Sequence, residues 1–298
     1  MVDRQRSVTN SDKSKYTRLN ILDRNRRSAQ FLSPQQTEIS SLITRVKLFM
    51  DKNFITFLIN LKRSPDRLQK MKTELEKQNI DFERIEAIDA NNLSQSDFDI
   101  CDTPNIEYPY RIKDGELACF LSHRMCWEKF IKSEKEWGLI IEDHCVLSPK
   151  AYNYLRSTDW IPKECEIIQF VFTQKPVSYR KEIHLPDGNS LLNIAYSSPI
   201  GTSGYFISRR AAEIALQHSN RILSPIDNYL FGSWSIFTKK VSCWRLRGAV
   251  IQRDSSLIST IKDRHKKKRK FYLSRYMIKA SLFVKRNFLS KTKQYWYE

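Results

Sequence analysis

Glycine is scarce in this chain, with seven among 298 residues. A Walker-type phosphate loop needs the spacing GxxxxGK[ST], and a dinucleotide-binding turn needs GxGxxG; the chain contains neither. The GxSxG turn that carries the nucleophile of serine hydrolases is also missing. These absences exclude P-loop NTPases, standard dinucleotide-binding enzymes and α/β-hydrolases.

Paired cysteines and long apolar runs are missing as well. The six cysteines form no CxxC pair, so we expect free thiols in a reducing compartment. No run approaches the ~20 apolar residues that span a bilayer, and residues 1–15 lack the apolar segment of a secretory signal. We therefore expect the protein on the cytoplasmic side of any membrane that it meets.

Acidic residues are rare at the two ends of the chain, and this imbalance produces most of the formal charge of +18. Residues 262–298 contain 13 Lys and Arg against two acids, and residues 1–50 contain ten against four. Residues 51–261 are nearly balanced, with 28 against 27. We predict a polar, basic N-terminal extension over 1–50, a globular domain over 51–261 and a basic tail over 262–298.

Both ends carry apolar residues at helical spacing. Residues 34–50 are a candidate amphipathic helix, and the tail places Leu273, Tyr276 and Phe283 on one helical face among Lys and Arg. A basic, aromatic-rich amphipathic helix favours an anionic membrane surface. If the tail is only such an anchor, a chain that ends at Thr260 should stay soluble. The alternative is a helix packed on its own domain. Basic ends also suggest nucleic-acid binding, but the core contains no recognition motif, so we consider nucleic acid an unlikely partner.

The middle of the chain alternates β-rich runs with helical patterns, which predicts an α/β domain around a central, mostly parallel sheet. Residues 92–113 should be an irregular loop. The expected strands are 54–61, 82–88, 139–147, 166–172 and 205–207, the expected helices are 65–78, 114–131 and 210–218, and a hairpin should occupy 174–195.

Three ionisable residues, Glu142, Asp143 and His144, directly follow the apolar run 139–141. Ionisable groups at the end of a buried strand are costly unless something neutralises them. Ligands of open α/β sheets bind outside the carboxyl ends of strands, and carboxylates and imidazoles coordinate divalent cations. The pattern predicts a metal site that bridges to a phosphorylated ligand. The alternative is that these groups cap the next helix or pair with Lys and Arg.

The turn after the first strand offers polar side chains where nucleotide-binding domains have glycines. It carries Asn60, Arg63 and Arg67. Arginine can hold a phosphate through two parallel hydrogen bonds. Solvated arginines beside an ordinary helix start are the alternative.

Two further segments are candidates for ligand contact. Gly201 and Gly204 are the one close glycine pair; they enclose Thr202 and Ser203, and their small size would let the backbone approach a ligand. His123 lies within the helix predicted at 114–131, where a packing role is the alternative to a binding role.

Four segments together resemble glycosyltransferase family 25, which includes lipopolysaccharide and collagen glycosyltransferases. The segments are INLKRSPDRLQKM at 59–71 with FERIEAIDA at 82–90, GELACFLSHRMCWEKF at 115–130, LIIEDHCVL at 139–147 and GTSGYFISRRAA at 201–212. SPIDNYL at 224–230 and VIQRDSS at 250–256 fit more loosely. The resemblance covers about residues 60–256 and leaves out both basic ends.

The resemblance implies a GT-A-like nucleotide-sugar fold and inverting transfer of a hexose, with galactose expected, from a UDP-sugar. The implied acceptor is lipopolysaccharide, lipooligosaccharide or a related glycan. The enzyme would then lie on the cytoplasmic, inner face of the bacterial inner membrane. The residues that we assign to donor binding are Asn60, Arg63, Arg67, Asp89, His123, Thr202, Ser203 and Gly204.

The family also implies a Glu-Asp-Asp metal motif. Glu142 and Asp143 match its first two positions, while His144 replaces the last acid. Imidazole suits Mn²⁺ better than Mg²⁺, so the resemblance implies Mn²⁺ (or Mg²⁺) bound by all three residues. The alternative is loss of metal and activity, which would leave a glycan- or partner-binding protein.

Transfer needs a general base to take the proton of the acceptor hydroxyl. Asp227 is the acid that we predict for this role, and Glu116 is the alternative. Negative charge builds on the leaving phosphate, where a cation and arginines would stabilise it.

Overall fold

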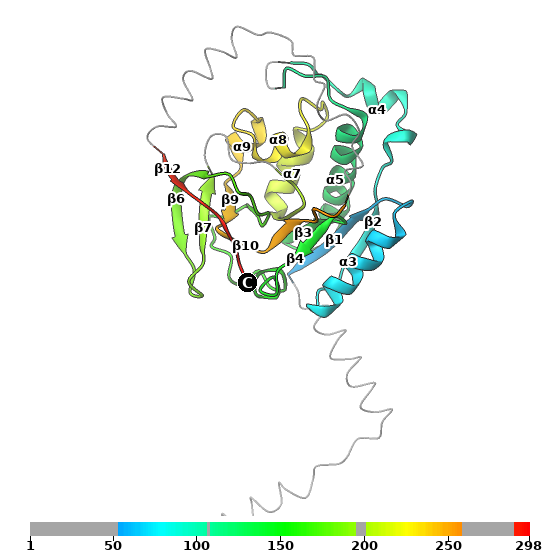
Figure 1. Cartoon of the computed structure of the whole chain (residues 1–298). Coiled ribbons are helices and arrows are strands. Elements are labelled where there is room, and N and C mark those ends of the chain that lie inside the picture. The colour runs from blue at the N-terminus through cyan, green and yellow to red at the C-terminus, as the bar shows by residue number, and fades with distance from the viewer. Residues whose placement is uncertain (1–52, 106–107, 195–200, 258–288) are drawn as a thin grey trace, which may run out of the picture. The chain divides into compact units, whose positions relative to one another are not determined.

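The computed structural model describes residues 53–105, 108–194, 201–257 and 289–298. The predicted N-terminal extension and most of the predicted tail therefore lie outside the described residues. The described residues form an α/β fold, as predicted, around a nine-stranded sheet (Figure 1). No helix among them is long and apolar enough to cross a membrane.

The strand order of the main sheet is β12-β6-β7-β9-β5-β8-β3-β1-β2. The bounds are β1 Phe54–Asn60, β2 Glu83–Glu86, β3 Trp137–Glu142, β5 Ile167–Gln169, β6 Val177–His184, β7 Ser190–Ile194, β8 Gly204–Ser208, β9 Cys243–Leu246 and β12 Ser290–Thr292. The sheet is parallel across β2-β1-β3 and between β5 and β9. β8 runs antiparallel to both β3 and β5, which makes the whole sheet mixed.

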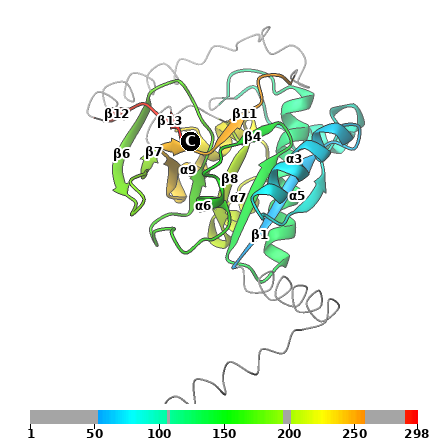
Figure 2. The same ribbon diagram turned by 60° about the horizontal axis from the view of Figure 1, so that its bottom comes forward.

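Two small sheets flank the large one. β4 (Cys145–Leu147) pairs antiparallel with β11 (Ile251–Arg253), side by side in Figure 2. β10 (Gly248–Ala249) pairs parallel with β13 (Tyr295–Trp296). The predicted strand over 139–147 is thus two strands, because the chain turns at Asp143 and His144 and leaves the main sheet.

Helices cover both faces of the main sheet. α5 (Asp114–Lys132), α7 (Arg209–Gln217), α8 (Ile226–Phe231) and α9 (Ile236–Lys240) contribute to one hydrophobic cluster, and α3 (Pro65–Lys77) and α6 (Tyr152–Leu155) contribute to the other (Figure 1). Strand β1 shows the underlying pattern. Phe57 and Ile59 belong to the first cluster, and Phe54 and Leu58 belong to the second. This alternation follows from the two-residue period of a strand.

The segment expected to be an irregular loop contains regular structure. The helix η1 (Ala90–Asn92) begins just before it, and α4 (Gln95–Asp99) lies inside it. Ser94 and Asp97 form a capping box at the start of α4. The Ser94 side chain accepts the backbone N–H of Asp97, and the Asp97 side chain accepts the backbone N–H of Ser94. A polar helix of five residues has no apolar periodicity to reveal it.

The end of the chain differs from the predicted tail. Strand β12 pairs antiparallel with β6, and β13 pairs with β10. Gln294 between them is buried, and its amide donates to the Leu246 carbonyl over 2.8 Å. The last ten residues are therefore part of the domain, and residues 262–288 of the tail predicted over 262–298 lie outside the described residues.

Candidate functional site

Strands β1 and β3 bring their carboxyl ends to the same edge of the sheet. They run parallel, with Ile59 opposite Glu142. Beside this edge lies a cavity of about 670 Å³, a size within the usual range for small-molecule sites. Nine of the predicted site residues line it: Arg63, Arg67, Glu116, Glu142, Asp143, His144, Thr202, Ser203 and Asp227.

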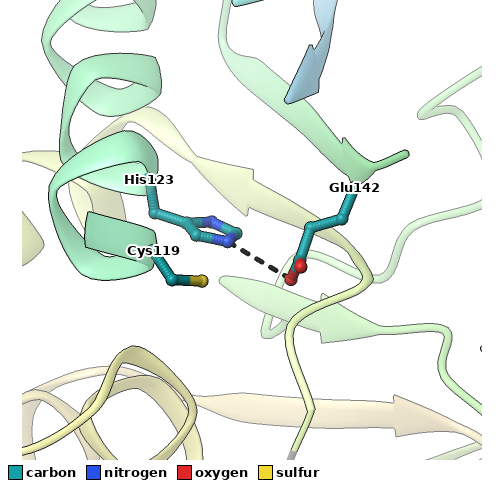
Figure 3. Close-up of side chains that lie close together, drawn as sticks. All are labelled: Cys119, His123 and Glu142. Atoms are coloured by element: carbon teal, nitrogen blue, oxygen red, sulfur yellow. Dashed lines mark ion pairs between the residues drawn. The ribbon is translucent and has the colours of Figure 1, made fainter. Parts of the chain in front are cut away.

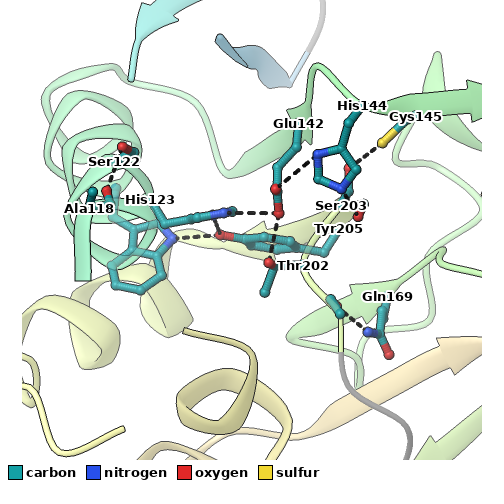
Figure 4. Close-up of polar contacts among 12 residues, drawn as sticks. Ala118, Ser122, His123, Glu142, His144, Cys145, Gln169, Thr202, Ser203 and Tyr205 are labelled. Carbon is teal, nitrogen blue, oxygen red and sulfur yellow. Dashed lines mark hydrogen bonds and ion pairs between the residues drawn. The ribbon is translucent and has the colours of Figure 1, made fainter. Parts of the chain in front are cut away.

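Glu142, the last residue of β3, is the centre of a polar network (Figure 4). Thr202 Oγ1 donates to Glu142 Oε1 over 2.7 Å, and His123 Nε2 lies 3.4 Å from the same oxygen. His144 Nδ1 lies 3.4 Å from the other oxygen, Oε2. Burial alone would raise the pKa of Glu142, but His144, His123 and Thr202 outweigh it and lower the pKa to about 2. Glu142 is therefore an ionised carboxylate at neutral pH.

Asp143 points a different way from Glu142. Asn60 Nδ2 donates to Asp143 Oδ2 over 2.7 Å, and Arg67 Nη1 lies 3.9 Å from Oδ1. Burial raises the pKa of Asp143, while Asn60, Arg67 and His144 act in the opposite direction. His144 in turn lies 3.1 Å, through Nε2, from the Ser203 hydroxyl. Asp143 is thus held by Asn60 and Arg67, and His144 is held by Ser203.

The three predicted metal ligands do not converge on one point. Glu142 and His144 face each other, but Asp143 is not brought together with them. Within the part of the chain that the structure describes, three ligand groups lie within 4.8 Å of one another only in the set Cys119, His123 and Glu142. A cation held by Glu142 and His144 would take its remaining ligands from substrate oxygens, which is how Mg²⁺ and similar hard cations are bound beside phosphates. The pair therefore fits a cation shared with a diphosphate.

Two residues predicted to bind the donor do not line the cavity but hold its wall. Asn60 donates to Asp143 and to the Ser64 carbonyl, and it accepts from Arg84. Asp89 pairs with Arg63 and caps η1. The hydrogen bond from Arg63 is the main reason why the pKa of Asp89 is lowered. Both residues support the wall in this way, and their contact with a donor stays a prediction.

Gly204 and His123 also lie outside the lining of the cavity, and their roles in donor binding stay predictions. A Cβ added at Gly204 would lie 2.1 Å from Ile251 Cδ1, so this glycine makes room for a core side chain. His123 is fully buried on α5, behind Glu142, and does not line the cavity. Its ring Nδ1 lies 2.9 Å from the Tyr205 hydroxyl (Figure 4).

Both candidate bases line the cavity, but their surroundings differ. Glu116 Oε2 accepts the backbone N–H of Lys113 over 3.1 Å as part of the capping box of α5. Asp227 lies in the first turn of α8, where its Oδ1 accepts from the Asn228 backbone over 2.7 Å and its residue is half-buried. Because the Glu116 carboxylate caps the start of the long helix α5, we prefer Asp227 as the candidate general base.

Some cavity residues were missed from the sequence. Cys119, Ser122, Tyr108 and Arg253 line it. Cys119 and His123 are spaced i, i+4 on one helix, a signal that could have been found from the sequence. Ser122 accepts the backbone N–H of Ile88 over 2.9 Å and so ties α5 to the wall beyond β2. Tyr108 and Arg253 reach the cavity through loop and strand geometry that no local pattern reveals.

The chain is similar to known glycosyltransferases. It is 28% identical over 199 residues to the lipooligosaccharide biosynthesis protein lic2B of Haemophilus influenzae, covering 63% of this chain and 73% of that protein. It is 29% identical over 186 residues to procollagen galactosyltransferase 2 of Homo sapiens, covering 58% of this chain and 29% of that protein. A solved glycosyltransferase involved in glycosylating the major capsid of PBCV-1 superposes with a TM-score of 0.39 at 12% identity, over 78% of this chain and 98% of that chain.

Several relatives are much longer than the matched region. A glycosyltransferase 25 family member of Drosophila pseudoobscura is 29% identical over 194 residues, which are 62% of this chain and 30% of that protein. The family model described as glycosyltransferase family 25 (LPS biosynthesis protein) matches residues 52–230. That match spans more than half of the 298 residues, and the chain therefore belongs to glycosyltransferase family 25.

Proposed function

We propose that the protein transfers a hexose, galactose in our hypothesis, from a UDP-sugar to a lipooligosaccharide or related glycan, with inversion at the sugar carbon. One observation carries this proposal: arginines suited to a diphosphate and an acid suited to a general base line the same cavity. Arg63, Arg67 and Arg253 supply the positive charge, and Asp227 supplies the acid. The GT-A-like fold that the family implies is of the α/β class found here.

The chemistry follows from these side chains. Asp227 takes the proton of the acceptor hydroxyl, whose oxygen forms the new bond to the sugar carbon as the bond to the diphosphate breaks. Arg63, Arg67 and Arg253 stabilise the negative charge that develops on the departing diphosphate. A divalent cation, Mn²⁺ or Mg²⁺, would neutralise part of that charge when held by Glu142 and His144. Asn60 keeps Asp143 directed toward Arg67, which orients this arginine at the cavity wall.

The test is release of UDP from a panel of UDP-sugars, with and without a truncated lipooligosaccharide and with Mn²⁺. We expect acceptor-dependent release from UDP-galactose. Asp227→Asn should lower kcat by about 10²–10⁴ because the base is lost, whereas Glu116→Gln should have a much smaller effect on kcat. Equal losses in the two variants, with both folded, would reject Asp227 as the base.

A protein that binds glycan without turnover is the second candidate. It is favoured by His144 in place of the third acid and by Asp143 being held away from Glu142 and His144. This candidate predicts binding of the truncated lipooligosaccharide without release of UDP from any donor in the panel.

We further propose that residues 262–298, with 13 basic residues, attach the enzyme to an anionic membrane surface. The nucleotide-sugar donor and a lipid-linked acceptor would then meet at the cytoplasmic face of the bacterial inner membrane. This proposal rests on charge and on the apolar spacing of the sequence.

A further inference from the structure

A second cluster of ligand groups lies at the wall of the cavity. Cys119 and His123 are one helical turn apart on α5, and Glu142 faces them from the end of β3 (Figure 3). One ligand atom from each lies within 4.8 Å of the other two. This cluster shares Glu142 with the Glu142–His144 pair. The two histidines lie beside different carboxylate oxygens of Glu142, with His123 near Oε1 and His144 near Oε2.

His123 provides an independent observation that points to a ligand. Its side chain is 0% exposed, and its Nε2 atom has no hydrogen-bond partner among the described residues although it is aimed at Glu142. Nε2 and Glu142 Oε1 are 3.4 Å apart (dashed line in Figure 3). Nitrogen and oxygen ligands that each lie about 2.0–2.1 Å from a tetrahedral Zn²⁺ are separated by about 3.3–3.4 Å. The spacing thus equals that of two ligands of one tetrahedral ion.

We propose that Cys119, His123 and Glu142 form a binding site for Zn²⁺ that is separate from the cation proposed for the diphosphate. A thiolate, an imidazole and a carboxylate form a donor set that selects Zn²⁺ over Mg²⁺ or Mn²⁺. Two negative charges from the thiolate and the carboxylate balance the charge of the ion. Cys119 and Glu142 both line the cavity, so an ion can enter from it and keep a fourth position open toward it.

The surroundings of the cluster can hold its ligands in place. Thr202 Oγ1 donates to Glu142 Oε1 over 2.7 Å. His123 Nδ1 lies 2.9 Å from the Tyr205 hydroxyl, which also accepts from Trp127 Nε1 over 3.1 Å. Zinc-bound histidines almost always place their second ring nitrogen in such a hydrogen bond. With zinc bound at Nε2, the single proton of the His123 ring must lie on Nδ1, where it is donated to the Tyr205 oxygen. The net release is then one proton, from the Cys119 thiol.

The same atoms allow one competing arrangement without a metal. If the Tyr205 hydroxyl donates to His123 Nδ1, the imidazole proton must be on Nε2, where it points at Glu142 Oε1. His123 would then be a fixed donor to Glu142 and could not coordinate Zn²⁺. The two arrangements differ in the protonated ring nitrogen and in the state of the Cys119 thiol, and both differences can be measured.

Co²⁺ is a suitable probe because, unlike Zn²⁺, it absorbs light when bound. We expect the full-length protein titrated with Co²⁺ to show a thiolate-to-metal charge-transfer band in the near ultraviolet and to lose that band when Zn²⁺ displaces Co²⁺. Cys119→Ser should abolish the band. Cys101→Ser is the matched control, because Cys101 is likewise half-buried but lies outside the cluster, and it should leave the band intact.

A second measurement keeps the proposal testable if a variant is unstable. In ¹⁵N-histidine spectra of the unaltered protein, Zn²⁺ should move the His123 proton to Nδ1, and a thermal melt should show that the serine variants are folded. No charge-transfer band in the unaltered protein, a band that persists in folded Cys119→Ser, or a proton that stays on Nε2 at saturating Zn²⁺ would each overturn the zinc site. None of these readouts depends on transferase activity.

Discussion

The amide of Asn60 decides the direction of the Asp143 carboxylate. It donates to Asp143 Oδ2 and to the Ser64 carbonyl, and both acceptors belong to the turn region at the strand ends. Asp143 is 7% exposed, so water cannot easily replace a lost donor. A buried acceptor without its donor costs about 1–3 kcal/mol.

Asn60→Ala should therefore lower the free energy of unfolding by about 1–3 kcal/mol, measured by urea denaturation. The matched control is Asn53→Ala, which removes an exposed amide that bonds Glu136, and its effect should be within about 0.5 kcal/mol. Equal effects of the two substitutions would show that Asn60 does not support Asp143.

Gly204 offers a second test at the level of one residue. Gly204→Ala places a Cβ against Cδ1 of the fully buried Ile251, and overpacking of this kind costs about 1–3 kcal/mol. Adding Ile251→Val removes the clashing methyl and should restore part of the lost stability in the double variant. Gly201→Ala is the control, because its Cβ would lie 3.7 Å from Val171 in ordinary contact. If Ile251→Val merely adds its own loss to that of Gly204→Ala, packing against Ile251 is not the reason for this glycine.

Residue types at the site could be predicted from the sequence, but the directions of their side chains could not. Glu142, Asp143 and His144 were found because charge after an apolar strand is unusual. Their divergence could not be found, because it depends on Asn60 and Thr202, which come from distant segments. The packing of Gly204 could not be found for the same reason: its neighbour Ile251 is far away in the sequence.

At the level of elements, strong periodicity made prediction reliable. Strand β1 and helices α3 and α5 lie within a few residues of their predicted ranges, and the hairpin of β6 and β7 was also found. Short elements without periodicity, such as α4 and α9, were not. Strands β12 and β13 are only three and two residues long, and their pairing with β6 and β10 is visible only in the assembled sheet.

These two strands change the expectation for a shortened chain. A chain ending at Phe288 loses Gln294, which accepts from the Thr173 backbone over 3.1 Å and from Arg245 over 3.3 Å and donates to Leu246. Because the Thr173 N–H, the buried Arg245 side chain and the buried Leu246 carbonyl lose a partner, the melting temperature should fall clearly, contrary to the expectation for a chain ending at Thr260. Gln294→Ala should reproduce part of the loss, whereas Lys293→Ala, at an exposed position, should not. An unchanged melting temperature after truncation would mean that the two strands add nothing to the domain.

At the level of the whole molecule, charge and chemistry occupy different parts of the chain. The nearly neutral residues 51–261 contain the cavity, and the strongly basic stretch 266–270 follows them in the sequence. Each Lys or Arg near an anionic surface contributes about 1 kcal/mol, and salt screens this attraction beyond about 8 Å at physiological ionic strength. Replacing the five basic residues 266–270 with Gln should weaken co-sedimentation with anionic vesicles at least tenfold, and added salt should partly detach the unaltered protein.

This full-length variant keeps β12 and β13, so unfolding of the sheet would not explain a loss of vesicle binding. Its melting temperature should match that of the unaltered protein. The matched control replaces five basic residues in the N-terminal extension with Gln: Arg4, Arg6, Lys13, Lys15 and Arg18. If the tail is the anchor, this control keeps most of its vesicle binding despite an equal loss of charge. Equal weakening in both variants would instead indicate attraction by net charge alone, and no weakening in either would rule out an electrostatic anchor.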